Sequence, residues 1–194
     1  MTDLLPSPLR EQLQGLNVYL VGMMGAGKST VGRVLAQQLG YQFFDTDTVI
    51  EQVTGQAIAT LFAETGEAGF RDVERRVLSE LAAYTRLVVA TGGGIVTQPD
   101  NWGILRQGVV VWLDVPVMEL HSRLQTDTSR PLLQTGDLAT RLQTLLDERR
   151  SRYAQADVQV PFLPDESVEH LATRTQNLIR TVLKTPTPPP DYGN

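Results

Sequence analysis

The stretch VGMMGAGKST, residues 21–30, decides the fold predicted for this chain. It fits the pattern Gly-x-x-x-x-Gly-Lys-Ser, in which backbone N–H groups of a glycine-rich turn surround phosphate oxygens. Lys28 is expected to reach the outer phosphates, and the Ser29 hydroxyl to bind Mg²⁺. An apolar run at residues 16–21 precedes the loop, and apolar residues at helical spacing follow it. This strand, loop and helix predict a nucleotide-phosphate site. A plain glycine turn capped by Ser29 is the alternative.

Further short apolar runs alternate with helical patterns along the rest of the chain. The predicted strands cover residues 16–21, 41–45, 87–90, 109–113 and 158–160. The predicted helices cover residues 31–39, 46–84 with breaks near Gly55 and Gly66, 117–125, 138–154 and 166–183, with Asp165 as the cap of the last. Strands that alternate with helices predict an α/β fold with a parallel sheet covered on both faces.

Length and composition indicate one domain and exclude several classes of protein. With 194 residues the chain is expected to form a single domain at residues 15–184, after an N-terminal extension at 1–14. The proline-rich end, residues 185–194, is predicted to be a disordered tail. A net charge of -5 argues against a general nucleic-acid or membrane surface. No apolar run approaches the ~20 residues that span a bilayer. The absence of cysteine fits a reducing compartment, and a cytoplasmic location is expected.

Two carboxylates follow the second predicted strand. Asp45 and Asp47 are two residues apart, so an extended chain would point both the same way, toward the crevice at the strand ends. One could support a metal ion and the other could accept a hydroxyl proton. The alternative is an acidic cap on the following helix. Asp114, after the fourth strand, competes for the metal role. Since the two histidines lie in mostly solvated helical patterns, a carboxylate is expected to be the base.

Arginines and glycines form the second part of the predicted site. Arg71 lies three residues before Glu74, so the two share a helix face and form either an ordinary ion pair or an oriented fork for a substrate carboxylate. Three consecutive glycines follow the third strand, as expected where backbone approaches a ligand closely. Arg130 lies in a polar loop that can close over a phosphoryl group. The stretch DERRSRY supplies three more arginines, and spacing alone does not choose among Arg149, Arg150 and Arg152.

The ordered set of motifs resembles the shikimate kinase family. The resemblance runs over residues 16–183 and rests on GMMGAGKSTVG, DTD, GEAGFR, TGGG, RPLL and ERRSRY, in that order. It implies a three-layer P-loop fold with a five-stranded parallel sheet flanked by helices, like that of nucleoside monophosphate kinases. It also implies transfer of the ATP γ-phosphoryl group to the 3-hydroxyl of shikimate, on the route to chorismate and the aromatic amino acids.

The resemblance also implies roles for individual residues. Asp47 would bind the shikimate hydroxyls and act as the base, while Asp45 and Ser29 would hold one Mg²⁺. The lid, about residues 124–137, would bring Arg130 to the phosphates. The catalytic residues would be Lys28, Asp47 and Arg130. ATP would contact Gly25, Ala26, Gly27, Lys28, Ser29, Thr30, Arg123 and Arg130. Shikimate would contact Asp47, Arg71, Gly92, Gly93, Gly94 and Arg149. Contacts to adenine at residues 160–167 stay open.

Two other functions compete with this one. The first is a different small-molecule P-loop kinase, such as one of the gluconate type. The second is a nucleotide-binding module without catalysis. The Asp pair, the arginines and the glycine triplet favour an intact acceptor site over both. The partners expected are ATP and shikimate, with no nucleic acid and no membrane, and the chain is expected to be a monomer.

Overall fold

A computed structural model describes residues 8–125 and 137–183 of the chain. The predicted tail and most of the predicted lid, including Arg130, lie outside the described residues.

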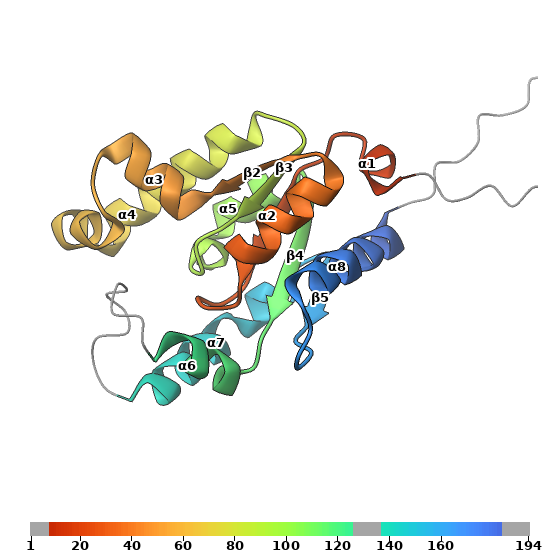
Figure 1. Ribbon diagram of the computed structural model, residues 1–194. Helices are drawn as coiled ribbons and strands as arrows, with labels where there is room; N and C mark the ends of the chain where they lie inside the picture. Colours follow the sequence, from red (N-terminus) through yellow and green to blue (C-terminus); the bar gives the residue numbers. More distant parts are fainter. Residues whose placement is uncertain (1–7, 126–136, 184–194) are drawn as a thin grey trace, which may run out of the picture.

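Five parallel strands form the sheet, which confirms the predicted fold class (Figure 1). Their order is β2-β3-β1-β4-β5. The strands are β1 Val18–Val21, β2 Gln42–Asp45, β3 Leu87–Ala90, β4 Val109–Asp114 and β5 Val158–Pro161. Both β1 and β3 are buried along their whole length, as expected of a parallel sheet with two covered faces. The chain leaves β1 toward β2 on one side but later crosses to β4 on the other, so a crevice opens at the carboxyl end of β1.

Helices cover both faces of this sheet. They are α1 Leu9–Gln12, α2 Lys28–Leu39, α3 Thr46–Thr54, α4 Ile58–Ala82, the 3₁₀ turn η1 Ile95–Thr97, α5 Pro99–Leu105, α6 Val117–Leu124, α7 Leu138–Tyr153 and α8 Val168–Val182. In Figure 1, α2 and α8 lie side by side. Gly32 of α2 packs against Leu20, whereas Tyr153 of α7 stacks on Trp112. Because Leu20 pairs with Val111, the neighbour of Trp112, α2 and α7 lie on opposite faces.

The breaks predicted within residues 46–84 are confirmed. Gly55 ends α3 with a φ of 68°, and Gly66 interrupts α4 with a φ of 68° and a ψ of -177°. Phe62 before the kink and Phe70 after it nevertheless face each other, with ring centroids 5.7 Å apart. The two segments of α4 on either side of the kink therefore contact each other through these aromatic rings.

Three expectations about the helices need correction. The last helix begins at Val168, and Ser167 caps it by accepting the backbone N–H of His170 at 3.2 Å. Asp165 is therefore not the cap; it lies in the preceding loop with a φ of 56°. Both α5 and η1 were absent from the sequence pattern. So was α1, within the predicted N-terminal extension, where Leu9 is buried against the core.

None of the helices in the described ranges combines the length and the hydropathy that a bilayer crossing demands.

Candidate active site

The phosphate loop joins the end of β1 to the start of α2. Gly27 caps the helix in the left-handed region, with a φ of 89°. Lys28 follows as the first helical residue, and only 8% of its surface is exposed. Its Nζ donates to the carbonyl oxygens of Gly22 and Met23, each at 2.9 Å. The ammonium group is therefore held inside the loop, beside the helix N-terminus where an anion binds favourably.

A cavity of about 480 Å³ opens in front of this loop. Residues predicted to contact the nucleotide line it: Gly25, Ala26, Gly27, Lys28, Ser29, Thr30 and Arg123. Arg123 donates from Nη1 to the Gly25 carbonyl oxygen at 3.2 Å, and its guanidinium lies 5.5 Å from the ring centre of Phe162. The flat guanidinium and the ring form a surface suited to a planar base.

Ser29 and Asp45 meet at the edge of the nucleotide cavity. The Ser29 hydroxyl donates to Asp45 Oδ2 through a short hydrogen bond. The other carboxylate oxygen, Oδ1, accepts the backbone N–H of Asp47 at 3.0 Å and of Thr48 at 3.4 Å. Asp45 is therefore also a helix cap. Two oxygen ligands fit a hard cation such as Mg²⁺, which takes few protein ligands and completes its shell with water and phosphate. The described residues hold no cluster of three or more metal-ligating side chains.

The geometry predicted for the two aspartates was wrong. We expected Asp45 and Asp47 to point the same way along an extended chain. Instead β2 ends at Asp45 and α3 begins at Thr46, so Asp47 belongs to the first turn of a helix. The two carboxylates consequently separate: both line the nucleotide cavity, but only Asp47 also lines the second one.

The second cavity, of about 360 Å³, adjoins the first. One side is apolar, and the other carries the predicted acceptor residues. The apolar side includes Met24, Ile58, Phe62 and Phe70, and the polar side includes Asp47, Arg71, Glu74, Gly92, Gly93, Gly94 and Arg149. Its volume suits a small ring. Asp47, Gly92 and Gly93 line both cavities, so they stand at the boundary between them.

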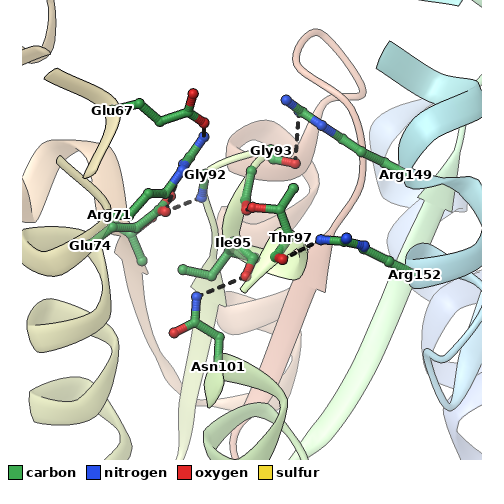
Figure 2. Close-up of polar contacts among 12 residues, drawn as sticks. Glu67, Arg71, Glu74, Gly92, Gly93, Ile95, Thr97, Asn101, Arg149 and Arg152 are labelled. Atoms are coloured by element: carbon green, nitrogen blue, oxygen red, sulfur yellow. Dashed lines mark hydrogen bonds and ion pairs between the residues drawn. The ribbon is translucent and has the colours of Figure 1, made fainter. Parts of the chain in front are cut away.

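A buried ion pair forms one wall of the second cavity (Figure 2). Arg71 Nη1 lies 2.8 Å from Glu74 Oε2, and Nη2 lies 3.3 Å from the more exposed Glu67. Burial, the largest single influence, favours a lower pKa for Arg71, but the charges and hydrogen bonds of Glu74 and Glu67 together outweigh it and raise the pKa. Arg71 Nε and Glu74 Oε1 are buried and have no hydrogen-bond partner among the described residues.

The glycine triplet lets this ion pair approach the sheet. A Cβ at Gly92 would overlap the Glu74 carboxylate, and one at Gly94 would overlap the Arg71 guanidinium. Neither glycine has a positive φ. Gly92 and Gly94 therefore permit close approach of the ion pair and do not form an unusual turn. The close approach of a ligand to the triplet stays a prediction.

The structure chooses among the arginines of the DERRSRY stretch. Arg149 is 7% exposed, and its Nη1 donates to the Gly93 carbonyl oxygen at 3.2 Å. The side chain of Arg150 is 52% exposed and lies beside Asp114. Arg152 donates to the Thr97 carbonyl oxygen. Only Arg149 of the three lines the acceptor cavity in the described part of the chain (Figure 2).

Asp114 was predicted as a competing metal ligand, but it does not lie at the site of Ser29 and Asp45. One oxygen of its carboxylate accepts from Gln159 Nε2 at 2.8 Å and lies 4.0 Å from the Arg150 guanidinium. Within residues 8–125 and 137–183, neither cavity wall includes Asp114. These contacts favour Asp45 for the metal role.

Several lining residues escaped the sequence analysis. Glu166, Val168 and Leu171 at the start of α8 line the nucleotide cavity, and Phe162 stacks beneath Arg123. They fall in or next to residues 160–167, whose contacts the sequence left open. No motif marks them, because they reach the cavity through the packing of α8 on α2.

Glu74→Gln is expected to change how stability depends on pH. Burial raises the pKa of Glu74 above its ordinary 4.5, Arg71 opposes the rise and Asp47 adds to it. From pH 4.5 up to the raised pKa, the folded chain keeps a proton that the unfolded chain has lost, so wild-type stability falls as pH rises. Glutamine does not titrate. Over that interval the variant's unfolding free energy should rise relative to wild type, by up to about 1.4 kcal/mol per pH unit. Urea unfolding at successive pH values measures this, and a constant difference would contradict it.

Comparison with known proteins points to one family. The family model for shikimate kinase matches residues 24–180. A shikimate kinase of Synechococcus elongatus is 55% identical over 172 residues, covering 89% of this chain and 90% of that protein. One from Nostoc is 52% identical over 172 residues, covering 89% and 95%.

Solved structures agree with the sequence relatives. Shikimate kinase from Acinetobacter baumannii, in complex with shikimate, superposes with a TM-score of 0.84 at 41% identity, covering 90% of this chain and 98% of that one. A gluconokinase from Sinorhizobium meliloti superposes with a TM-score of 0.56 at 16% identity, covering 87% and 94%. The second likeness shows a common fold alone.

Proposed function

The chain belongs to the shikimate kinase family, and from this premise we propose that it transfers the γ-phosphoryl group of ATP to the 3-hydroxyl of shikimate. The products are shikimate 3-phosphate and ADP. One observation carries the proposal: a phosphate-loop cavity and a small polar cavity share Asp47, Gly92 and Gly93 as walls. A phosphoryl group in the first cavity can therefore meet a hydroxyl group in the second without crossing solvent.

Two arginines would hold the acceptor by its carboxylate. Arg71 and Arg149 come from different elements, α4 and α7, and both line the smaller cavity. Planar guanidinium groups match a planar carboxylate through paired hydrogen bonds. Shikimate carries a single carboxylate on a ring, so fixing that group leaves few orientations for the ring hydroxyls.

The phosphate loop would stabilise the transferred group. Phosphoryl transfer depends mainly on positioning and on neutralising charge at the phosphoryl oxygens. The ammonium group of Lys28, already inside the loop, can turn from the Gly22 and Met23 carbonyls to a phosphate oxygen. Ser29 and Asp45 would hold Mg²⁺, which when bound supplies further charge neutralisation.

Asp47 is our candidate for the base. It lies on the boundary of the two cavities, in the first turn of α3. In the step, the 3-oxygen of shikimate forms a bond to the γ-phosphorus while the bond to the β,γ-bridging oxygen of ATP breaks. The hydroxyl proton passes to an Asp47 oxygen and the electron pair of the broken bond leaves with ADP.

The competing functions have less support. A gluconate-type kinase would share the fold, but several relatives at 50–55% identity are shikimate kinases. A module without catalysis would be expected to have a damaged acceptor wall, whereas here Asp47, Arg71 and Arg149 all line one cavity.

Identification of the product tests the proposal. After incubation with Mg-ATP and shikimate, ³¹P NMR should show a phosphate coupled to the proton on carbon 3. Gluconate offered under the same conditions should stay unmodified. Phosphorylation of gluconate and not of shikimate would favour the competing kinase.

Arg149→Met should raise the KM for shikimate by about 10–100-fold and leave the KM for ATP nearly unchanged. Hydrogen bonds to charged groups contribute about 1.5–3 kcal/mol, and methionine keeps an unbranched apolar stem without the donors. Arg150→Met is the matched control, because Arg150 is the next residue and its side chain is exposed. Steady-state kinetics with each substrate varied measure both constants. An unchanged KM for shikimate in Arg149→Met would remove Arg149 from the acceptor site.

Other predictions extend this function. Arg130 is proposed to act on the phosphates from a lid at residues 124–137, within a domain at residues 15–184. A monomeric state and a cytoplasmic location, where ATP is abundant, also stay predictions.

A further inference from the structure

Tyr153, the last residue of α7, reaches the boundary between the two cavities. Its hydroxyl donates to the Gly93 carbonyl oxygen at 2.6 Å and lies 3.8 Å from the Met23 sulfur in the phosphate loop. The side chain is fully buried, and its ring stacks on Trp112 with centroids 5.8 Å apart. Burial raises the pKa of Tyr153, so the phenol keeps its proton and remains a donor.

The Gly93 carbonyl that Tyr153 holds occupies a central place. Arg149 Nη1 donates to the same oxygen at 3.2 Å (Figure 2). On its other side Gly93 packs on the phosphate loop, where a Cβ would lie 3.4 Å from both the Gly22 carbonyl oxygen and the Met24 nitrogen. The position of this one peptide therefore sets how the nucleotide cavity, the glycine triplet and Arg149 lie relative to one another.

Three side chains of α7 donate hydrogen bonds to backbone carbonyl groups of residues 93 and 97, and we call them the α7 clasp: Arg149, Arg152 and Tyr153. Arg149 and Tyr153 hold Gly93, and Arg152 holds the carbonyl of Thr97 in η1. Of the three, Tyr153 is the only neutral donor. It carries no charge and therefore gains less than the two arginines from turning toward an anionic ligand, so its bond can persist when substrates bind.

We propose that Tyr153 is a positioning residue for the phosphoryl transfer: its hydroxyl fixes the Gly93 carbonyl, and thereby places the glycine triplet and Arg149 between the two substrates. The inference rests on the proposed function for its kinetic consequence. Without the phenolic hydroxyl, Arg149 would be the one side chain of the clasp left on the Gly93 oxygen. Its guanidinium would then serve both that carbonyl and the acceptor carboxylate, and the loop would shift.

Tyr153→Phe removes the hydroxyl and keeps the ring that stacks on Trp112. Since a displacement of about 1 Å costs about 100-fold in rate, we expect the smaller shift here to lower kcat with shikimate about tenfold. The KM for Mg-ATP should stay within about twofold. Hydrogen exchange of the backbone amides at residues 92–97 should become faster.

Tyr19→Phe is the matched control. Tyr19 is 1% exposed and likewise loses its hydroxyl, but it lies in β1, and its contact with Asn17 is 3.4 Å long. We expect a similar change in Tm, unchanged kcat and unchanged exchange at residues 92–97. A kcat or an exchange rate in Tyr153→Phe equal to that of Tyr19→Phe would overturn the inference.

Hydrogen exchange requires no turnover, so it separates the two proposals. A wild-type chain that does not phosphorylate shikimate would overturn the proposed function, whereas exchange decides whether Tyr153 holds the loop. Arg152→Met gives a second measurement if Tyr153→Phe does not fold. It releases the same segment at Thr97 and should also speed exchange at residues 92–97, and unchanged exchange would contradict the clasp.

Discussion

Lys28→Ala should lower kcat by about 10²–10³-fold, the cost of removing one preorganised charge from a site where negative charge must be stabilised. The Nζ is held by the Gly22 and Met23 carbonyls inside the loop, beside the N-terminus of α2. Backbone N–H groups and the helix dipole remain in the variant, so nucleotide binding should weaken far less than turnover falls. Steady-state kinetics at saturating substrates and a titration with ADP measure the two effects.

The chain offers a matched control for Lys28→Ala. The chain has one other lysine, Lys184, just after α8. Lys184→Ala makes the same change of charge and should leave kcat unaltered. Wild-type turnover in Lys28→Ala would contradict the role assigned to the phosphate loop.

Asp47→Asn should lower kcat by about 10²–10⁴-fold, the usual contribution of a positioned general base. Asparagine has nearly the same shape, so the first turn of α3 and the boundary between the cavities should persist. The affinity for Mg-ATP should therefore change little. Kinetics with shikimate, together with equilibrium binding of Mg-ATP, separate the two quantities.

Asp114→Asn is the comparison for this second variant. Asp114 is a carboxylate at the end of β4 that accepts from Gln159 and lies near Arg150. Its substitution should leave kcat near wild type. Equal losses in Asp47→Asn and Asp114→Asn would mean that the two carboxylates matter only for the fold.

The strands, helices and turns of this protein could be predicted well, because the sequence patterns that indicate them are local. The phosphate loop, Gly40 after α2 and the breaks at Gly55 and Gly66 each depend on a few neighbouring residues. Apolar runs as short as β3 are recognisable since both faces of a parallel sheet are buried. The same applies to the glycine triplet, which follows β3, whereas the choice of Arg149 over Arg150 and Arg152 required the structure.

Other features depend on where an element ends or on how elements pack. The expected alignment of Asp45 and Asp47 assumed a chain that stays extended past Asp45, but β2 ends there and Asp47 lies in the first turn of α3. Helix α1 has four residues, too few to show a periodic pattern, yet it buries Leu9. Tyr153 looks like the end of an arginine-rich helix, and its contact with Gly93 exists only because α7 lies against β4.

Release of ADP with and without shikimate tests the central claim most directly. In a coupled assay with Mg-ATP, ADP should appear rapidly when shikimate is present and only slowly when it is absent, because water is a poor substitute for a ring hydroxyl that Arg71 and Arg149 position by holding the carboxylate of the same molecule. Equal rates of ADP release in the two conditions would contradict the assignment of this chain as a shikimate kinase.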